Sequence, residues 1–363
     1  MALRTTDYLK MKKTILLFLV SIMALTADAQ DPQFTQFYAA PLALNPAMTG
    51  NFPGRYRIGM IYRDQWRGVF DQPYKTFSAA VDVRFDISTN SRYKDAVGIG
   101  LIFKSDQVGG IDFETNEIAL SGSFHKSLGY QGSQTLSGGI QLGLVQRSVL
   151  YANLDFDDQF NSIDGFTLAT AEDLPPNIIS FSDINAGINY RLQLGKKTVL
   201  NIGGSIHHIL SPNVSLYPDE VLPGGTIIPG GDNEYFARLG GQLSLRFPVG
   251  ERAALIPRAL FSKQGPHIQL TTGSNIRVPV DDYSGNALQF GFWARPVSNE
   301  DESISLDAVI AMVGMEWRGV LFGLSYDVNI DDLTVHQQGQ QSFEISILYL
   351  GDFESDNLLC PKF

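Results

Sequence analysis

The adjacent histidines His207 and His208 are the side chains of this sequence most suggestive of a metal or catalytic centre. They lie in the alternating stretch VLNIGGSIHHI, and neighbouring residues of a strand point to opposite faces. Two side chains on opposite faces cannot hold one metal ion by simple chelation. A packing or rim role for the pair is therefore favoured over a metal or catalytic role.

Other motifs lack the partners that their chemistry requires. A serine hydrolase would need a Ser, a His and an acid that converge, and the sequence has no GxSxG turn to support one. The glycine-rich stretches at 97–101 and 200–206 have strand patterns and lack the helix that follows a phosphate-binding loop. The run DFDDQF at 155–160 lacks the spacing of a calcium loop and is more typical of a solvated loop. We expect no enzymatic activity, no cofactor and no metal.

The N-terminus has the pattern of a secretory signal peptide. Lys12 and Lys13 precede an apolar run at 15–25, and small residues suited to cleavage follow it. The apolar run is too short for a membrane-spanning helix, which needs about 20 residues. We expect residues 1–29 to be removed on export.

The mature chain is acidic and has one cysteine. Removal of residues 1–29 takes away four basic and two acidic residues, so the formal net charge changes from −11 to −13. This charge argues against nucleic acid as a partner and favours a partner surface that is basic or mixed in charge. Cys360 has no second cysteine to pair with, so no internal disulfide stabilises the exported chain.

The stretch RYRIGMIYR at 55–63 alternates two kinds of side chain. Because a strand has a side-chain period of two, Ile58 and Met60 fall on an apolar face, and Arg57 and Arg63 fall on a polar face. The alternation recurs in about fourteen segments, each near the ~10 residues of a tilted membrane strand. It fits a soluble sandwich, with its apolar face in a core, or an outer-membrane barrel, with its apolar face in lipid.

Connection lengths favour the barrel. The connections between successive expected strands fall into two sets when they are taken alternately. One set contains the longest connections, at 148–181 and 211–234, and the other set contains short turns such as 194–197. Long loops on one rim and short turns on the other are typical of a barrel with one rim facing the exterior. We predict an all-β, antiparallel transmembrane β-barrel of about 14 strands over 55–350, in contact with outer-membrane lipid and followed by a tail at 351–363.

Residues 30–54 precede the first expected strand and have no clean strand or helix period. The segment is too aromatic for a disordered tail. Two interpretations are open: an irregular plug or lid packed into the barrel mouth, or a tail that binds a partner. The plug is favoured, because exposed aromatic surface on an exported tail would be a liability. The candidate plug or partner-contact residues are Phe34, Phe37, Tyr38, Asn45 and Pro46.

A series of short motifs together resembles one protein family. In order along the chain they are DPQFTQFYAAPLALNPAMTG at 31–50, YRDQW at 62–66, HHILSPNVS at 207–215, KQGPHIQL at 263–270, GLSYDVNIDDL at 323–333 and CPKF at 360–363. The sequence resembles the PorP/SprF family of outer-membrane proteins associated with type IX secretion and gliding motility. Lys362 stands where the terminal motif of that family leads us to expect arginine.

The resemblance carries implications for function. It implies a barrel without known enzymatic activity, required for export or surface attachment of specific cargo proteins, such as large adhesins with a type IX sorting domain. It also implies periplasmic contact with the secretion machinery. The alternative is a passive outer-membrane channel or importer of hydrophobic small molecules. The matched positions expected to be structural or docking residues are His208, Pro212, Asn213, Gln264, Gly265, Pro266, Ser325, Tyr326 and Asp327.

Overall fold

The structure is a computed structural model. It describes residues 31–68, 72–87, 95–129, 133–195, 197–217, 220–221, 227–228, 230–231, 233–250, 252–281, 285–298, 303–330 and 341–351. The expected signal peptide at 1–29 and the tail from residue 352 onward, with Cys360, lie outside the described residues.

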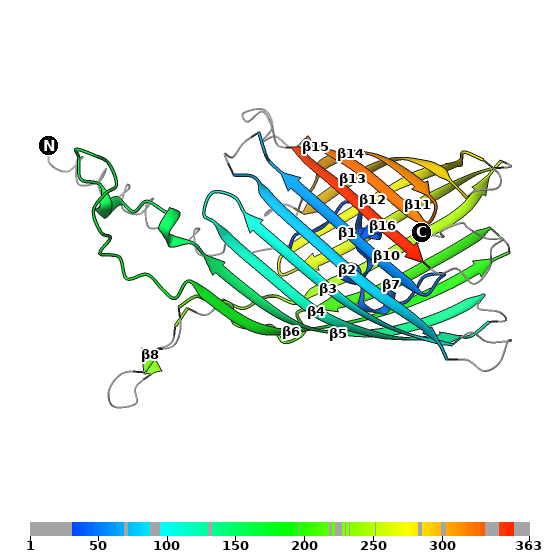
Figure 1. Ribbon diagram of the computed structural model, residues 1–363, viewed down its shortest axis with the longest axis horizontal. Helices are drawn as coiled ribbons and strands as arrows, with labels where there is room; N and C mark the ends of the chain where they lie inside the picture. The colour runs from blue at the N-terminus through cyan, green and yellow to red at the C-terminus, as the bar shows by residue number, and fades with distance from the viewer. Residues whose placement is uncertain are drawn as a thin grey trace, which may run out of the picture. The chain divides into compact units, whose positions relative to one another are not determined.

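Fourteen antiparallel strands close into a barrel (Figure 1). Each strand pairs with its neighbours in the chain, β7 pairs with β10, and β16 pairs with β1 to close the ring. Closure leaves no unpaired sheet edge, which a lipid environment requires. The barrel strands are β1 (Tyr56–Gln65), β2 (Tyr74–Asp86), β3 (Ala96–Val108), β4 (Phe113–Ser127), β5 (Gln134–Val149), β6 (Ile178–Leu194), β7 (Thr198–His207), β10 (Arg238–Val249), β11 (Ala253–Gln264), β12 (His267–Pro279), β13 (Ala287–Ser298), β14 (Ile304–Trp317), β15 (Val320–Asn329) and β16 (Gln341–Gly351).

The remaining elements are short. Between residue 31, where the description begins, and β1 lie three helical pieces: η1 (Phe37–Ala39), α2 (Pro41–Leu44) and η2 (Pro46–Met48). The connection from β5 to β6 contains η4 (Tyr151–Asn153) and η5 (Asp157–Gln159), and the connection from β7 to β10 contains the paired strands β8 (Glu220–Val221) and β9 (Ile227–Ile228). No helix within the described ranges has the length and apolarity to cross a membrane.

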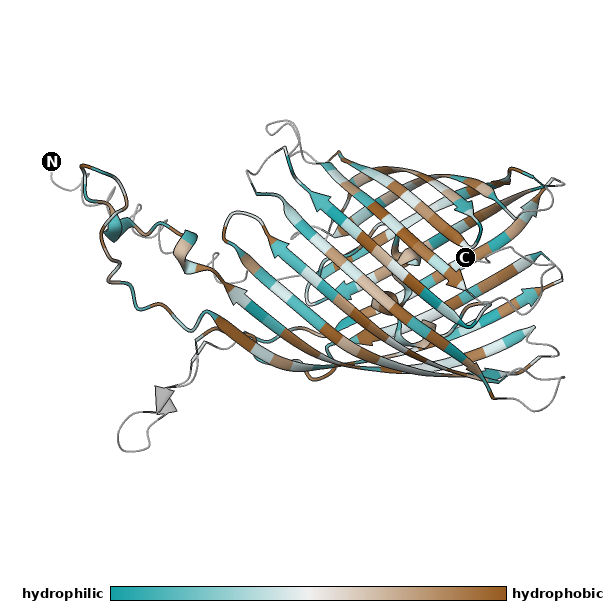
Figure 2. Cartoon of the chain, viewed as in Figure 1, coloured by the Kyte–Doolittle hydropathy of each residue, from teal (hydrophilic) through white to brown (hydrophobic). Residues whose placement is uncertain are grey.

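The two faces of the wall have opposite chemistry, as the sequence predicts. Along β1, Met60 is 47% exposed on the outside, whereas Arg63 is 4% exposed on the inside. Ile58 lies on the same outward face as Met60, and Arg57 lies on the same inward face as Arg63. Figure 2 shows the apolar and polar bands alternating along the strands. The predicted fold class and strand number are confirmed.

The two ends of the barrel differ in the length of their connections. We call the end with the spans from Val149 to Ile178 and from His207 to Arg238 the long-connection end. The opposite end, with the turns between β6 and β7 and between β14 and β15, is the short-turn end. This separation agrees with the predicted sorting of loops, and it makes the long-connection end the expected exterior side.

Candidate functional site: the plugged lumen

Residues 33–54, here called the plug, lie inside the barrel (Figure 1). Proline starts both α2 and η2, where its missing N–H costs no helix hydrogen bond. The Asn45 side chain accepts a hydrogen bond from Ala47 N at 2.8 Å and caps η2. These local turns fold the chain into a compact irregular body in place of a further strand.

The first part of the plug is held by a buried carboxylate on β16. Glu344 accepts hydrogen bonds from Thr35 N at 2.7 Å and from Gln36 N at 2.9 Å. Arg63 on β1 donates to the same carboxylate at 2.8 Å. Hydrogen bonds to a charged group each contribute about 1.5–3 kcal/mol. Glu344 is therefore a main anchor of the plug.

A second buried acid extends this anchor. Asp327 on β15 accepts a hydrogen bond from the Thr35 hydroxyl at 2.8 Å and forms an ion pair with Arg295 on β13. Gln36 donates to Ser325 Oγ at 3.2 Å. Buried charges are costly unless they are paired and hydrogen-bonded, and this pair meets inside the barrel from strands on either side of β14. Of the motif residues on β15, Ser325 and Asp327 thus contact the plug.

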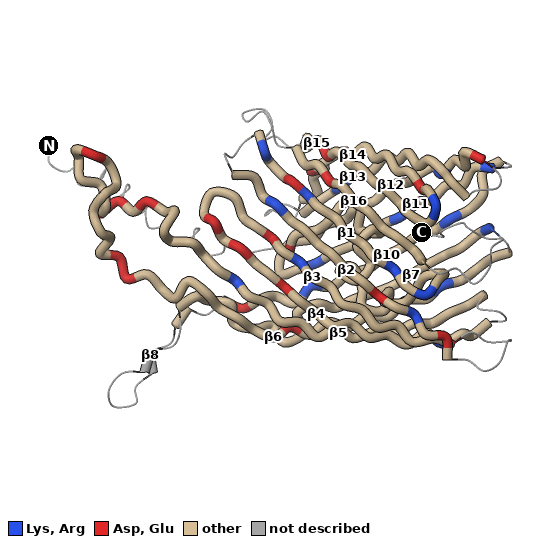
Figure 3. Tube along the Cα trace, viewed as in Figure 1, with Lys and Arg blue, Asp and Glu red and all other residues tan. Residues whose placement is uncertain are grey.

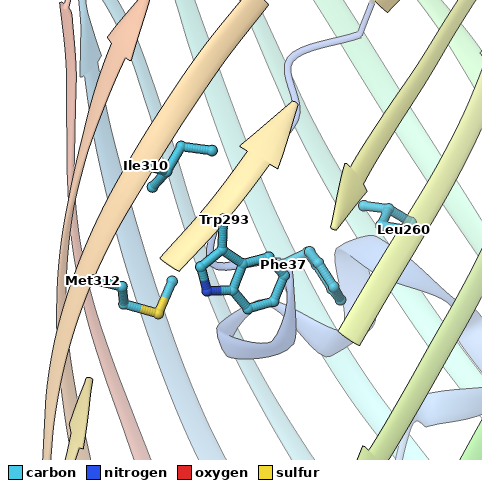
Figure 4. Packing of buried hydrophobic residues seen from close by; sticks show 5 residues of the cluster. All are labelled: Phe37, Leu260, Trp293, Ile310 and Met312. Atoms are coloured by element: carbon cyan, nitrogen blue, oxygen red, sulfur yellow. The ribbon is translucent and has the colours of Figure 1, made fainter. Parts of the chain in front are cut away.

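An apolar cluster follows along the plug (Figure 4). Phe37 meets Trp293 edge to face, with ring centres 5.7 Å apart. Tyr38 stacks on the same indole and donates its hydroxyl to Met312 Sδ at 2.7 Å. The Arg258 guanidinium lies 4.0 Å from the centre of the Tyr38 ring, a cation–π contact. Burial raises the pKa of the Tyr38 hydroxyl, so the group remains a proton donor. Phe34 packs in a neighbouring cluster, with Ile61.

The middle of the plug reaches the opposite wall. The Asn45 amide donates to the carbonyl oxygens of Ile188 at 3.0 Å and Gly204 at 3.1 Å, on β6 and β7. An uncharged amide can satisfy two carbonyls in this way, whereas a carboxylate would repel them. The Gln141 side chain on β5 donates to Leu42 O at 3.4 Å.

The last part of the plug is held near the short-turn end. Asp82 on β2 accepts from Gly50 N at 2.7 Å and from two nitrogens of Arg57, at 2.9 and 2.7 Å. Arg57 also donates to Met48 O at 2.9 Å. On β4, His125 Nε2 lies 2.8 Å from Thr49 O. The plug is therefore tied to several sides of the wall.

Lumen-facing glycines make room for the plug. A Cβ built on Gly98 would lie 2.3 Å from Thr49 O, and one on Gly139 would lie 2.4 Å from the Pro46 carbonyl carbon. Cβ positions on Gly187 and Gly323 would meet the side chains of Asn45 and Gln36 at 2.0 and 2.2 Å. Of these four glycines, only Gly98 lies in one of the glycine-rich stretches, 97–101, that the sequence predicts to be strand and not a phosphate-binding loop. All four glycines lie on the polar face of their strands. A glycine at such a position was the available sign in the sequence that another backbone approaches the wall there.

The histidine pair departs from the expected geometry. His208 follows the last residue of β7 and has a φ of +56°, so both rings are buried and do not lie on opposite faces. His207 Nε2 lies 3.3 Å from Leu44 O of the plug. His208 Nδ1 lies 3.0 Å from Asp183 Oδ1, and its ring stacks on Tyr235 at 4.1 Å. The packing interpretation agrees with these contacts, although the opposite-face argument for it was wrong.

The other motif residues lie at or near the long-connection end, in several places. Pro212 O accepts from Tyr235 N at 2.9 Å, and the exposed Asn213 donates to Gly231 O at 3.1 Å. Gln264 donates to Phe236 O at 3.2 Å, and Gly265, with a φ of +54°, forms the turn that continues into Pro266. Tyr326 faces outward.

These positions form no single centre. Within the described ranges, no group of three or more His, Cys, Asp or Glu side chains could hold a metal ion. The residues that the structure brings together are those between plug and wall.

Comparison with known proteins gives one family. A family model described as type IX secretion system membrane protein PorP/SprF matches residues 26–349. No curated protein matches the chain.

Solved structures resemble the barrel at low identity. A TodX monoaromatic hydrocarbon channel deltaS2 mutant is 11% identical, with a TM-score of 0.47 over 85% of this chain and 93% of that chain. A Pseudomonas aeruginosa FadL homologue is 12% identical, with a TM-score of 0.46 over 85% and 93%. The Ralstonia pickettii toluene transporter TbuX is 11% identical, with a TM-score of 0.45 over 87% and 94%.

Proposed function

Because the chain belongs to the PorP/SprF family of type IX secretion system membrane proteins, we propose that it is a non-enzymatic outer-membrane barrel needed for export or surface attachment of specific cargo. The family match over residues 26–349 carries this proposal. The cargo is an exported protein such as a large adhesin with a sorting domain. The barrel binds this cargo and contacts periplasmic components of the secretion machinery.

The plug supports a docking role over a role as a conduit for the cargo. Glu344 and Asp82 hold opposite ends of the plug with hydrogen bonds to its backbone. Each of these hydrogen bonds to a charged group contributes about 1.5–3 kcal/mol. A chain that crossed this lumen would have to break both anchors and displace the aromatic cluster around Trp293. Cargo contact at the outer surface leaves these interactions intact.

The distribution of charge supports different partners at the two ends (Figure 3). The segment between β5 and β6, at the long-connection end, contains acidic residues and no Lys or Arg from residue 150 to 177. Exposed basic side chains at the short-turn end are Arg55, Lys126, Lys197, Arg252 and Arg318. Complementary potentials favour encounter, and like charges oppose it. We assign cargo to the long-connection end and the periplasmic machinery to the short-turn end.

A deletion experiment tests the function. The gene is removed in frame, and the strain is complemented with the full chain. Surface proteins are then quantified by mass spectrometry, and uptake of a labelled hydrophobic compound is measured in parallel. We expect one or a few sorting-domain proteins to be missing from the surface while other type IX export and uptake continue. A normal surface proteome with defective uptake would instead support the importer.

A further inference from the structure

The connection between β5 and β6 is the longest described segment outside the barrel wall, and we call residues 150–177 the acidic arm. It contains six exposed carboxylates and no Lys or Arg. These acids are Asp155, Asp157, Asp158, Asp164, Glu172 and Asp173. The arm lies at the long-connection end, beyond the ends of β5 and β6 (Figure 1).

The arm has a defined conformation of its own. Phe160 and Phe166 form a β-bridge, and Asn161 N donates to Gly165 O at 2.9 Å. The Asn161 side-chain oxygen accepts from the backbone N–H groups of Ile163 and Asp164, at 2.8 and 2.7 Å. These bonds form a tight turn over 160–166, which we call the arm tip. A preorganised turn loses less conformational entropy on binding than a flexible loop.

The arm tip exposes three large apolar side chains within one short turn. Ile163 is 87% exposed, Phe160 is 52% exposed and Phe166 is 46% exposed. The two phenyl rings lie 5.3 Å apart, so they present one joint surface. Aromatic side chains that are rigidly held and exposed are the kind that dominate binding energy when a partner covers them.

The charges around the arm tip favour a protein over a lipid surface as the binding partner. Outward apolar residues on the barrel strands face lipid, but the arm has no cation to bind phosphate headgroups. An anionic lipid surface would repel its carboxylates, and a basic protein surface would attract them. We propose that the arm tip is the docking site for an exported protein that has an apolar recess bordered by Lys and Arg. This inference rests on the proposed function, because the bound protein is the cargo.

Site-specific crosslinking in whole cells tests the docking site. A photoreactive amino acid replaces Ile163 in the full chain, and the matched control carries it at Ile111 in the turn between β3 and β4. Both residues are exposed and apolar and lie at the same end of the barrel. We expect position 163, and not position 111, to crosslink to a surface protein that the deletion strain lacks. Equal crosslinking of that protein at both positions would overturn the proposal.

Variants of the arm measure its contribution. We expect Phe160→Ser/Phe166→Ser to lower the amount of this cargo at the surface about tenfold or more, as loss of central aromatic contacts does elsewhere. Ile163→Ser is the second variant, because its exposed side chain can be truncated with little effect on the fold. Glu172→Lys/Asp173→Lys should weaken capture and reduce its dependence on salt. Ile111→Ser should match the wild type.

The outcomes separate the two proposals. Heat modification on gels establishes that each variant barrel has assembled. If deletion of the gene removes the cargo but Phe160→Ser/Phe166→Ser and Ile163→Ser both retain it at wild-type levels, the arm tip is not the docking site and the proposed function stands. If deletion leaves the surface proteome unchanged, the proposed function itself is wrong.

Discussion

Replacement of Glu344 by glutamine should release the first part of the plug. The substitution preserves side-chain size, but it removes the negative charge that Arg63 faces at 2.8 Å. Thr35 N and Gln36 N donate to different oxygens of the carboxylate. In glutamine, one of these two N–H groups would therefore face the side-chain NH2, which cannot accept a hydrogen bond. The bonds from Thr35 N and Gln36 N are those that join the plug to this carboxylate, and a hydrogen bond to a charged group contributes about 1.5–3 kcal/mol.

The expected cost to plug binding is at the upper end of this range, because the glutamine oxygen replaces only one of the two carboxylate acceptors. Arg63 retains a second acid, Asp327, at 3.5 Å, so its charge is not left without a counterion. A cost of about 3 kcal/mol in plug-to-wall hydrogen bonding corresponds to roughly a hundredfold increase in the population of barrels with a displaced plug, at about 1.4 kcal/mol per factor of ten. That increase should be visible as more frequent openings and a larger ion current in planar lipid bilayers.

Glu316→Gln is the matched control. Glu316 is a buried strand glutamate that accepts from Arg277 at 2.6 Å and from Gln289 at 2.6 Å, both on the wall. Its loss should lower the temperature at which the barrel unfolds on gels without raising the ion current. If Glu344→Gln conducts no more than the wild type, or if both variants raise the current equally, Glu344 is not an anchor of the plug.

Three further predictions concern the wall and the plug. Leu142→Arg should reduce the amount of assembled barrel on heat-modification gels, because arginine on the lipid face costs about 2–4 kcal/mol near the midplane. Equal yields of Leu142→Arg and Leu142→Ala would contradict the assignment of Leu142 to that face. Gly139→Val should expel the plug and raise ion conductance, because a Cβ there would lie 2.4 Å from Pro46, whereas Gly138→Val, with nothing within 4 Å of its Cβ, should behave as the wild type. Deletion of residues 33–50 should leave an inserted barrel with raised permeability or lost partner contact, and unchanged permeability together with unchanged cargo export would end the idea that the segment closes the lumen.

The fold could be predicted because the wall separates two solvents. Lipid accepts Ile58 and excludes Arg57, so each strand has to alternate, and a shift of one residue would place arginine in hydrocarbon. Connection lengths then distinguish a barrel from a sandwich. Both signals are local in sequence, and both can be recognised without knowing which strands pair.

The site could be predicted only in part, because its contacts are distant in sequence. The aromatic and proline content of the plug indicated a packed segment, and Phe37 does pack against Trp293. The partners of Asn45 could not be predicted, since it binds backbone carbonyls 143 and 159 residues away and carbonyls have no sequence signature. The opposite-face argument for His207 and His208 failed because the strand ends between them.

The central claim, that the barrel handles cargo with its lumen closed, is tested most directly by locking the plug. Thr49 Oγ1 on the plug and Ser121 Oγ on β4 lie 2.6 Å apart, so Thr49→Cys/Ser121→Cys, in a chain that also has Cys360→Ser, places two thiols in contact. The measurement is the amount of cargo at the surface of cells that carry the oxidised, locked barrel. A docking barrel predicts wild-type cargo levels with the plug locked. Loss of cargo from the locked barrel, with recovery after a reducing agent is added, would show that the plug has to leave and would contradict the claim.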